Sequence, residues 1–320
     1  MGFIGDIGHF IMTPLYYGIS ALLLGWHKFF GLFLDPEGGL SWALSIIGLT
    51  LVIRTALIPL FVKQIKSSRN MQLLQPKVKE LQKKYGHDRE RLAQETMKLY
   101  KDSGTNPFAS CLPILLQMPI FLALFRMLDQ ASKKGKAHGF LDETLAKQFG
   151  DSKLFDKIPV SGTFLDNGGV TGVMVVAAIL VVAMTATTFM TQRQLMSKNM
   201  PADALSGPYA QQQKMLLYVL PVVFAIGGVA FPIGVLVYWT VSNLWTMCQQ
   251  FYVIRNNPAP GTPAAEAKVQ RDRAKAERKG LTLEPETTDS QVAVIDEKPA
   301  PARQQPQRQT KAQRNKKKKR

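Results

Sequence analysis

Five apolar stretches are the feature that most constrains how this chain can fold. Each is long enough, or nearly so, to cross the hydrocarbon core of a bilayer, which takes about 20 residues of helix. None of the five contains an aspartate or a glutamate. They predict an all-α membrane protein with spans at about residues 40–62, 108–128, 170–190, 215–231 and 233–254. The mean hydropathy of −0.03 hides this pattern because the C-terminal part of the chain is strongly polar.

The charges between the spans predict an orientation. Residues 63–106, 191–214 and 255–320 carry net charges of +6, +2 and +9, which together make up the whole net charge of +17. The loop 129–169 is neutral, with six charges of each sign. In a five-span topology the three basic segments lie on one side of the membrane. By the positive-inside rule that side is the cytoplasm, so the N-terminus is outside and the C-terminus is cytoplasmic.

The first 39 residues are apolar but patterned. Large apolar side chains recur there at spacings of three and four, while polar side chains interrupt the other faces. The pattern favours an amphipathic helix in the outer membrane interface, with a true span as the alternative. The residues of the pattern are Leu15, Ile19, Leu22, Trp26, Phe29 and Phe33.

A cytoplasmic helical hairpin is predicted for residues 63–106. The turn and helix-start signal at Gly86, His87 and Asp88 divides the segment into two helices, which must run antiparallel. The expected seam consists of Met71, Leu74, Val78, Leu81 and Tyr85 facing Ala93, Met97 and Tyr100. After the last span, residues 255–320 have the composition of a disordered basic tail.

Arg54 is the residue that most needs an explanation. It lies in the first span, about 12 Å from its cytoplasmic end at the rise of an α-helix. A charge at that depth costs about 3 to 10 kcal/mol unless it is paired, hydrated or able to snorkel to the headgroups. Snorkelling stays open as an interpretation. Pairing within the membrane does not, because the spans contain no acidic residue.

Polar side chains in the spans favour hydration of Arg54. They could line a water-filled groove whose single positive charge is unmatched, so that its ligand would bring the carboxylate. Each alone is weak evidence, since serine and threonine often bond to their own helix. These residues are Ser41, Ser45, Thr50, Gln117, Thr185, Thr187, Thr188, Gln192, Thr240, Ser242 and Asn243.

The sequence carries no sign of covalent catalysis. The four histidines are scattered, Cys111 and Cys248 both lie in apolar runs, and no metal-ligand spacing, phosphate-binding loop or nucleophile motif occurs. We therefore expect no enzyme activity, no metal site, no cofactor and no small-molecule substrate.

Four stretches, in order along the chain, resemble the YidC/Oxa/Alb membrane protein insertases in their short form, without a large extracytoplasmic domain. The resemblance covers about residues 14–255. The stretches are LTLVIRTALIPL at 49–60, MQLLQPK at 71–77, NPFASCLPILLQMPIF at 106–121 and FPIGVLVYWTVSNL at 231–244. Family members of the short form include lipoproteins, but the absence of a cysteine near Met1 argues against a lipid anchor here.

The resemblance implies five core helices around a hydrophilic groove that is open to the cytoplasm and closed outside. It implies that Arg54 is the groove arginine and that residues 14–34 form the interfacial helix. It implies insertion of nascent membrane proteins with acidic translocated segments into the bacterial plasma membrane. Thr50, Gln192, Tyr238 and Trp239 would then line the groove, and Gln117 and Asn243 join them as candidates.

Partners follow from the same resemblance. The ribosome is expected at the basic end of the tail, with the Sec translocon and the bilayer as further partners. An anionic lipid surface is the other interpretation of that basic end, which holds Lys311, Arg314, Lys316, Lys317, Lys318, Lys319 and Arg320.

The sequence leaves two other functions as alternatives. A small-solute transporter or channel is expected to show internal repeats, and the sequence has none that we can identify. A non-catalytic assembly factor would not need Arg54 inside the membrane.

Overall fold

The computed structural model describes residues 3–104, 112–200 and 208–279, which are almost entirely α-helical. The chain divides into two compact units, Met1–Val269 and Gln270–Arg320. Everything described below belongs to the first unit, except that helix α11 crosses the boundary.

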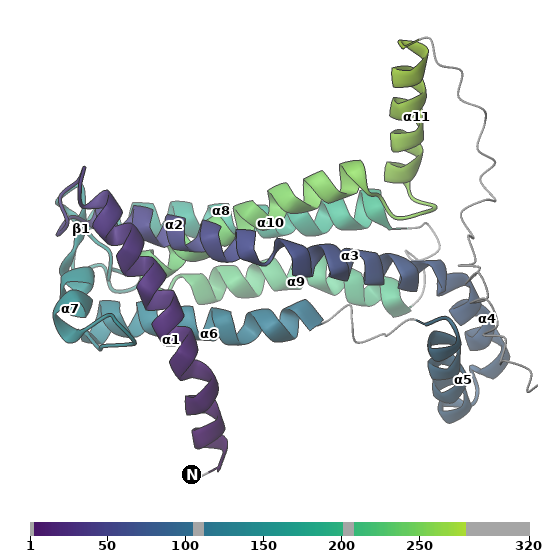
Figure 1. The fold of residues 1–320 in the computed structure, drawn as a ribbon, viewed down its shortest axis with the longest axis horizontal. Helices are drawn as coiled ribbons and strands as arrows, with labels where there is room; N and C mark the ends of the chain where they lie inside the picture. The colour runs from purple at the N-terminus through teal and green to yellow at the C-terminus, as the bar shows by residue number, and fades with distance from the viewer. Residues whose placement is uncertain (1–2, 105–111, 201–207, 280–320) are drawn as a thin grey trace, which may run out of the picture. The chain divides into compact units, whose positions relative to one another are not determined.

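Helices α2, α6, α8, α9 and α10 form the body of the first unit (Figure 1). Helix α10 packs against α8, α2 and α6, and α9 packs against α8. Two of the described helices, α2 and α8, are long and apolar enough to cross a membrane by length and composition alone, and α9 contains a shorter apolar run. The bounds of the five are α2 Gly39–Ala56, α6 Leu112–Lys134, α8 Thr171–Asn199, α9 Pro208–Gly228 and α10 Ile233–Asn256.

The stretch predicted as one span at 40–62 is not one continuous helix. Helix α2 ends at Ala56, and α3, Ile58–Leu73, begins after Leu57. The N–H of Leu57 still donates to the Ile53 carbonyl at 3.1 Å. Pro59 has no N–H to continue the pattern, which accounts for a break at this point. Helix α3 then runs well past residue 62, into the segment predicted as the hairpin.

The hairpin itself is shorter than predicted. It consists of α4, Gln75–Tyr85, and α5, Arg89–Asp102, which pack against each other. The carboxylate of Asp88 accepts a hydrogen bond from the Arg91 N–H at 3.0 Å, so the helix-start signal acts as an N-cap.

The hairpin seam differs from the expected one on α5. Leu74 and Val78 are buried as expected, but Met97 is 52% exposed. Leu92 and Leu99 are half-buried instead. Tyr100 is half-buried as expected, whereas Ala93 is exposed, so the buried face of α5 only partly matches the predicted one. Half of the residues of α5 are charged, and its few apolar side chains leave the facing side weakly specified.

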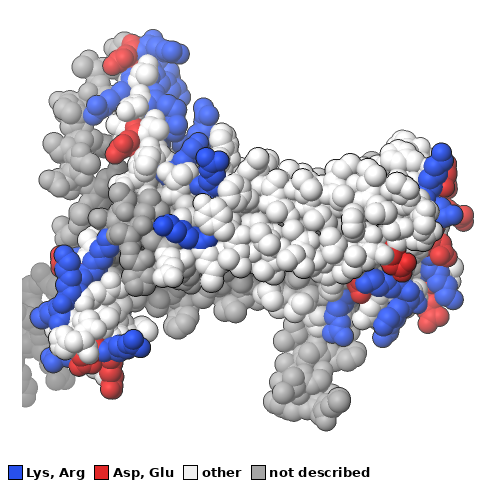
Figure 2. Space-filling view, turned by 180° about the vertical axis from the view of Figure 1, so that it is seen from behind, with Lys and Arg blue, Asp and Glu red and all other residues white. Residues whose placement is uncertain are grey.

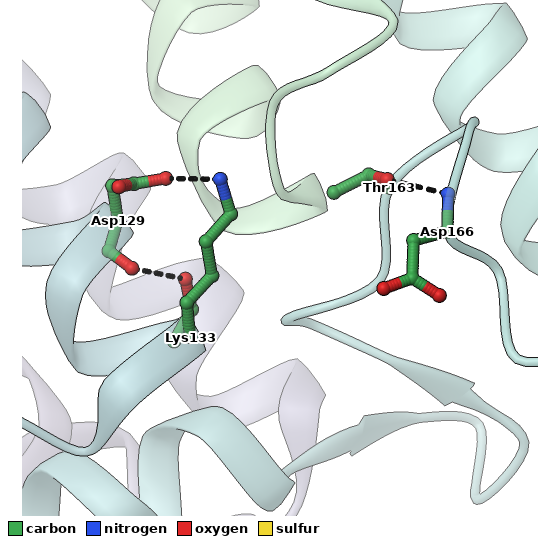
Figure 3. A network of polar contacts seen from close by, with 5 residues as sticks. Asp129, Lys133, Thr163 and Asp166 are labelled. Atoms are coloured by element: carbon green, nitrogen blue, oxygen red, sulfur yellow. Dashed lines mark hydrogen bonds and ion pairs between the residues drawn. The ribbon is translucent and has the colours of Figure 1, made fainter.

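The loop predicted at 129–169 contains regular structure. It forms helix α7, Glu143–Asp151, and a two-stranded antiparallel hairpin of β1, Lys153–Leu154, and β2, Ile158–Pro159. Local polar contacts lie near its two ends (Figure 3). Asp129 forms an ion pair with Lys133 at 2.8 Å, and the Asp166 N–H donates to the Thr163 hydroxyl at 2.8 Å.

This loop packs over one end of the helical body. The Phe149 ring of α7 meets the Trp42 ring of α2 edge to face at 5.2 Å, and both side chains are fully buried. The loop also satisfies two N–H groups at the start of α10: Ile233 donates to Gly162 at 3.0 Å, and Gly234 donates to Val160 at 3.1 Å. This end of the bundle is therefore closed by packed side chains and backbone hydrogen bonds.

Helix α1, Phe3–Phe30, is longer than the predicted interfacial helix and packs against α2 and α6. The side chains that pack inward include two polar ones, Ser20 and His27, and the His27 ring stacks on Trp42 at 3.7 Å. Much of the expected apolar pattern faces outward, with Phe29 48% and Phe33 74% exposed. An outward apolar face suits contact with lipid. Which residues of α1 face inward depends on how their side chains pack against α2.

Two polar segments hold more helix than predicted. Helix α8 continues to Asn199, so Arg193 and Lys198 lie on a helix rather than in a loop. The segment predicted to be a disordered tail contains α11, Pro263–Glu277. Its alanine, glutamate, lysine and arginine residues favour helix, and the Thr262 hydroxyl accepts a hydrogen bond from the Ala265 N–H at 3.3 Å. The basic cluster at 311–320 lies outside the described residues.

Charged side chains gather at the ends of the helical body on the face that Figure 2 shows, and a broad band between them is uncharged. Such a band matches the hydrocarbon core of a bilayer, where exposed charges are costly.

His138 links α1 to the loop 129–169, which the predicted topology places outside and which we call the outer loop, and it predicts a pH dependence. Its ring lies 4.5 Å from the Tyr16 ring, and its Nε2 donates to the Gln130 side-chain oxygen at 2.8 Å. Burial, with the positive charges of Lys136 and Arg126, lowers the pKa of His138 below its usual 6.5. The folded state then binds fewer protons than the unfolded state, so stability is full above pH 6.5 and is lost as the pH falls below it.

The expected result is a thermal midpoint that falls between pH 7.5 and pH 5.5, with a smaller fall in His138→Gln than in the wild type. Unfolding in neutral detergent, followed by near-UV circular dichroism, measures both. The matched control is His87→Gln at an exposed position of the hairpin turn. Equal pH dependence in His138→Gln and the wild type would remove His138 as a cause.

Candidate functional site

The side chain of Arg54 is half-buried, and it extends from α2 to α10. Its Nε donates to the Ser242 hydroxyl at 3.1 Å, and its Nη2 donates to the same oxygen. Within the described ranges no carboxylate forms an ion pair with Arg54. The guanidinium is therefore held in place by a neutral hydroxyl, and its positive charge is not neutralised there.

A polar stripe on α10 continues from this contact. Tyr238, Ser242 and Thr246 follow one another at one-turn spacing, on the same face of the helix. Tyr238 is buried, and the Thr246 hydroxyl donates to the Ser242 carbonyl at 2.9 Å. The stripe leads from Arg54 towards the C-terminal end of α10.

Thr246 also lines a cavity of about 330 Å³, bounded by α3, α8 and α10 and by the chain after α10. Its lining combines six polar residues with five apolar ones, and none of them is charged. We call this cavity the polar recess, and its polar lining residues are Gln64, Asn199, Thr246, Gln249, Gln250 and Asn257. Amides and hydroxyls both donate and accept hydrogen bonds, so this lining can contact polar groups of either kind.

Two further cavities lie near the recess. One, of about 450 Å³, lies between α3 and α10, is mostly apolar and shares Ile65, Gln249, Val253 and Asn257 with the recess. The other, of about 550 Å³, lies between α8 and α10. We call it the α8/α10 pocket, and its lining residues are Met190, Arg193, Gln194, Ser197, Lys198, Met247, Cys248 and Phe251.

The predicted site residues lie in different surroundings. Thr50 is buried one turn before Arg54, and its hydroxyl donates to the Ile46 carbonyl at 2.6 Å. Gln117 of α6 is half-buried, and its buried side-chain oxygen accepts no hydrogen bond from the residues that the structure describes. Gln192 is half-buried on α8. Tyr238 is brought together with Arg54 through Ser242.

Trp239 and Asn243 hold helices together. The Trp239 ring packs in an aromatic cluster, 5.3 Å from Phe121 and 5.0 Å from Phe224. The Asn243 amide donates to the Thr188 hydroxyl at 3.0 Å and to the Met184 carbonyl at 3.3 Å, which joins α10 to α8. None of the seven predicted groove residues lines the polar recess.

Sequence reasoning missed Gln64, Gln249 and Gln250, which line the recess. Gln249 and Gln250 lie inside the predicted fifth span, and Gln64 lies just after the predicted first span. Two adjacent glutamines near the basic end of an apolar stretch are a sequence signal that could have predicted a polar site there. What the sequence could not give is the convergence of α3 and α10 at this depth.

Replacing Asn243 by leucine should weaken the contact between α8 and α10. Two inter-helix hydrogen bonds are lost, at about 0.6 kcal/mol each inside a membrane, so we expect a stability loss of about 1 kcal/mol. Reversible unfolding in detergent measures it, with Leu244→Ala at an exposed position of the same helix as the control. An unchanged free energy of unfolding would show that these bonds do not contribute.

Comparisons with known proteins support one family. The model of the family described as 60Kd inner membrane protein matches residues 33–260. A protein of Streptomyces avermitilis named membrane protein insertase YidC is 46% identical over 85% of this chain. The aligned region spans only 64% of that relative's length. A relative of the same name from Tropheryma whipplei is 37% identical over 82% of this chain and 89% of its own length.

A solved structure titled "Active YidC insertase crystal structure with the first transmembrane domain resolved" aligns with 73% of this chain and 45% of its own. Its sequence identity is 22% and its TM-score is 0.44. The assignment rests on the sequence relatives and the family model. With that model matching most of the chain, the protein belongs to the YidC/Oxa/Alb family of membrane protein insertases.

Proposed function

We propose that this protein inserts nascent membrane proteins into the bacterial plasma membrane and helps them fold. The observation that carries the proposal is the Arg54–Ser242 contact, one helical turn from a recess whose lining holds six polar side chains and no charged one. The protein works by binding and releasing segments of its substrate, with no covalent step and no cofactor.

The proposed topology has five spans, at α2–α3, α6, α8, α9 and α10. The basic segments that follow α3, α8 and α10 are cytoplasmic by the positive-inside rule. The polar recess then opens on the cytoplasmic side, because it lies at the C-terminal ends of α8 and α10. The outer loop, with Phe149 against Trp42, closes the other side.

Arg54 provides the attraction in this mechanism. A carboxylate on the substrate accepts stronger hydrogen bonds from a guanidinium than a hydroxyl does, so it displaces Ser242 as the partner of Arg54. Ser242 takes the guanidinium back when the carboxylate leaves. An exchangeable neutral partner suits a site that must bind many substrates and release them.

Release follows from the energetics of the bilayer. The apolar helix of the substrate moves sideways into lipid, where its apolar side chains are stable. The membrane potential, positive outside, favours outward movement of a carboxylate by about 2.3 kcal/mol per 100 mV. Neither step requires a nucleotide. Nascent chains with acidic translocated segments are therefore the proposed substrates.

The ribosome and the Sec translocon are proposed partners. The basic cluster at 311–320, from Lys311 to Arg320, would contact ribosomal RNA through its phosphates, with an affinity that falls steeply with salt. Removing residues 280–320 should then lower ribosome co-sedimentation at low salt, and unchanged binding would exclude this cluster as the contact.

The proposed function is tested by reconstitution. A small membrane protein with an acidic translocated tail is synthesised in the presence of proteoliposomes that hold this protein or none. Protease protection of the tail measures insertion. The proposal expects protected tails only with the protein present, and equal protection in empty liposomes would contradict it.

A further inference from the structure

A second site lies in the α8/α10 pocket. This pocket of about 550 Å³ brings two basic side chains, Arg193 and Lys198, beside the apolar side chains of Met190, Met247 and Phe251. None of its lining residues is acidic. A pocket that combines positive charge with apolar walls does not suit a metal ion or a water-soluble cation. It suits an anion attached to something apolar.

The register of α8 and α10 orders these groups along the bundle. Thr240 bonds to the Leu180 carbonyl and Asn243 bonds to the Met184 carbonyl, so the two helices run parallel here. Met190 comes before Arg193, and Lys198 follows near the end of α8. The apolar side of the pocket therefore faces the middle of the bundle, and its basic side faces the end that we propose is cytoplasmic.

An exposed apolar stripe leads into the pocket. Val175, Ile179, Val182 and Met190 are 51%, 61%, 66% and 56% exposed, and their spacing places them on one face of α8. Arg193 continues that face at the next turn. From Val182 to Arg193 the helix rises about 16 Å, close to the hydrocarbon half-thickness of about 15 Å. The part of the stripe from Val182 to Arg193 therefore has the length of one acyl chain, and the stripe continues beyond it to Val175.

The buried amide of Gln194 favours a ligand that donates a hydrogen bond. Its side-chain oxygen is buried at the pocket and accepts no hydrogen bond from any residue in the described ranges. A ligand that carries a hydroxyl can donate to it, and an ionised phosphodiester cannot. The basic pair and the amide together fit a phosphodiester with a hydroxylated headgroup.

We propose that the α8/α10 pocket binds one anionic phospholipid of the cytoplasmic leaflet, with phosphatidylglycerol as the best fit. Arg193 and Lys198 hold the phosphate, Gln194 accepts from the glycerol headgroup, and an acyl chain lies along the stripe above Met190. Nucleic acid would use the two cations but would leave the apolar wall and stripe without a role. The site is independent of the insertion mechanism, which uses Arg54.

Cys248 makes the site measurable, because it is exposed and lines the pocket. The full chain, with Cys111→Ser so that a single thiol reacts, is purified in neutral detergent. The rate at which a maleimide modifies Cys248 is then followed as lipid is added. Phosphatidylglycerol should slow the reaction strongly at a mole fraction where phosphatidylcholine has little effect. Soluble glycerol phosphate should not slow it, since it has no acyl chain.

The double variant Arg193→Gln, Lys198→Gln supplies the decisive comparison. It should need about 30-fold more phosphatidylglycerol for half-protection, which corresponds to about 1 kcal/mol per basic residue. The matched control, Lys147→Gln with Lys157→Gln, removes two exposed charges from the outer loop and should change nothing. Native mass spectrometry of the same samples counts the retained lipid.

Three results would overturn the proposal. Equal protection of Cys248 by phosphatidylglycerol and phosphatidylcholine would mean that any lipid covers the pocket. Undiminished protection in the double variant would remove the basic pair. Protection by a polyuridylate RNA, with none by phosphatidylglycerol, would assign the pocket to nucleic acid. Insertion activity can be present or absent in every case, so this test and that of the proposed function fail separately.

Discussion

Arg54→Ala is expected to lower insertion of a substrate with an acidic translocated tail about tenfold or more. Arg54 supplies the positive charge at the head of the polar recess, where no carboxylate of the described residues neutralises it. A hydrogen bond to a charged group contributes about 1.5–3 kcal/mol, which corresponds to a factor of ten or more. Protease protection of the tail in proteoliposomes measures the yield.

Three controls separate charge from structure. Arg54→Lys keeps the charge and should retain most of the activity. Ser242→Ala removes only the exchangeable partner and should have a small effect. A substrate whose tail is neutral should insert equally well with the wild type and Arg54→Ala. Equal insertion of the acidic tail by all variants would make Arg54 a snorkelling residue and remove the proposed attraction.

Trp42→Ala should cause a large loss of stability. The indole is fully buried, stacks on His27 at 3.7 Å and meets Phe149 at 5.2 Å, so it joins α1, α2 and α7. Truncating a buried tryptophan to alanine costs about 3–5 kcal/mol through lost contacts and the cavity that remains. Thermal unfolding in detergent measures the effect.

Trp42→Phe should be much milder. It keeps an aromatic ring between His27 and Phe149, and it removes an indole N–H that none of the described residues accepts. Leu40→Ala, at a partly exposed position of α2, is the matched control and should lose well under 1.5 kcal/mol. A Trp42→Ala variant as stable as Leu40→Ala would show that this junction does not hold the outer end together.

The apolar stretches were readable from the sequence because helix in a bilayer is fixed by local composition. The helix break at Leu57 could also have been predicted, because Pro59 lacks the N–H that a continuous helix needs. The structure of the outer loop could not be predicted from the sequence. Its shape depends on contacts such as Phe149 with Trp42 and Gly162 with Ile233, which join residues far apart in the chain. No local pattern encodes such pairs.

The candidate site was predictable in part. The spans contain no acid to pair with Arg54, so its need for a polar neighbour followed from the sequence alone. That the neighbour is Ser242, 188 residues away, depends on how α2 packs against α10. Asn243 and Ser242 look equally suitable in sequence, yet one faces α8 and the other faces Arg54. Adjacent residues of a helix point in directions about 100° apart, so one contacts α8 and the other contacts Arg54.

The central claim is that nascent chains pass through the polar recess below Arg54. A photo-crosslinking amino acid placed at Gln249, which lines the recess, tests it most directly with ribosome-bound nascent chains of a membrane protein. The comparison position is Ile179, 61% exposed on α8 and away from the recess. The account predicts a nascent-chain adduct from Gln249 that far exceeds the one from Ile179. An adduct from Ile179 alone, or none from Gln249, would contradict it.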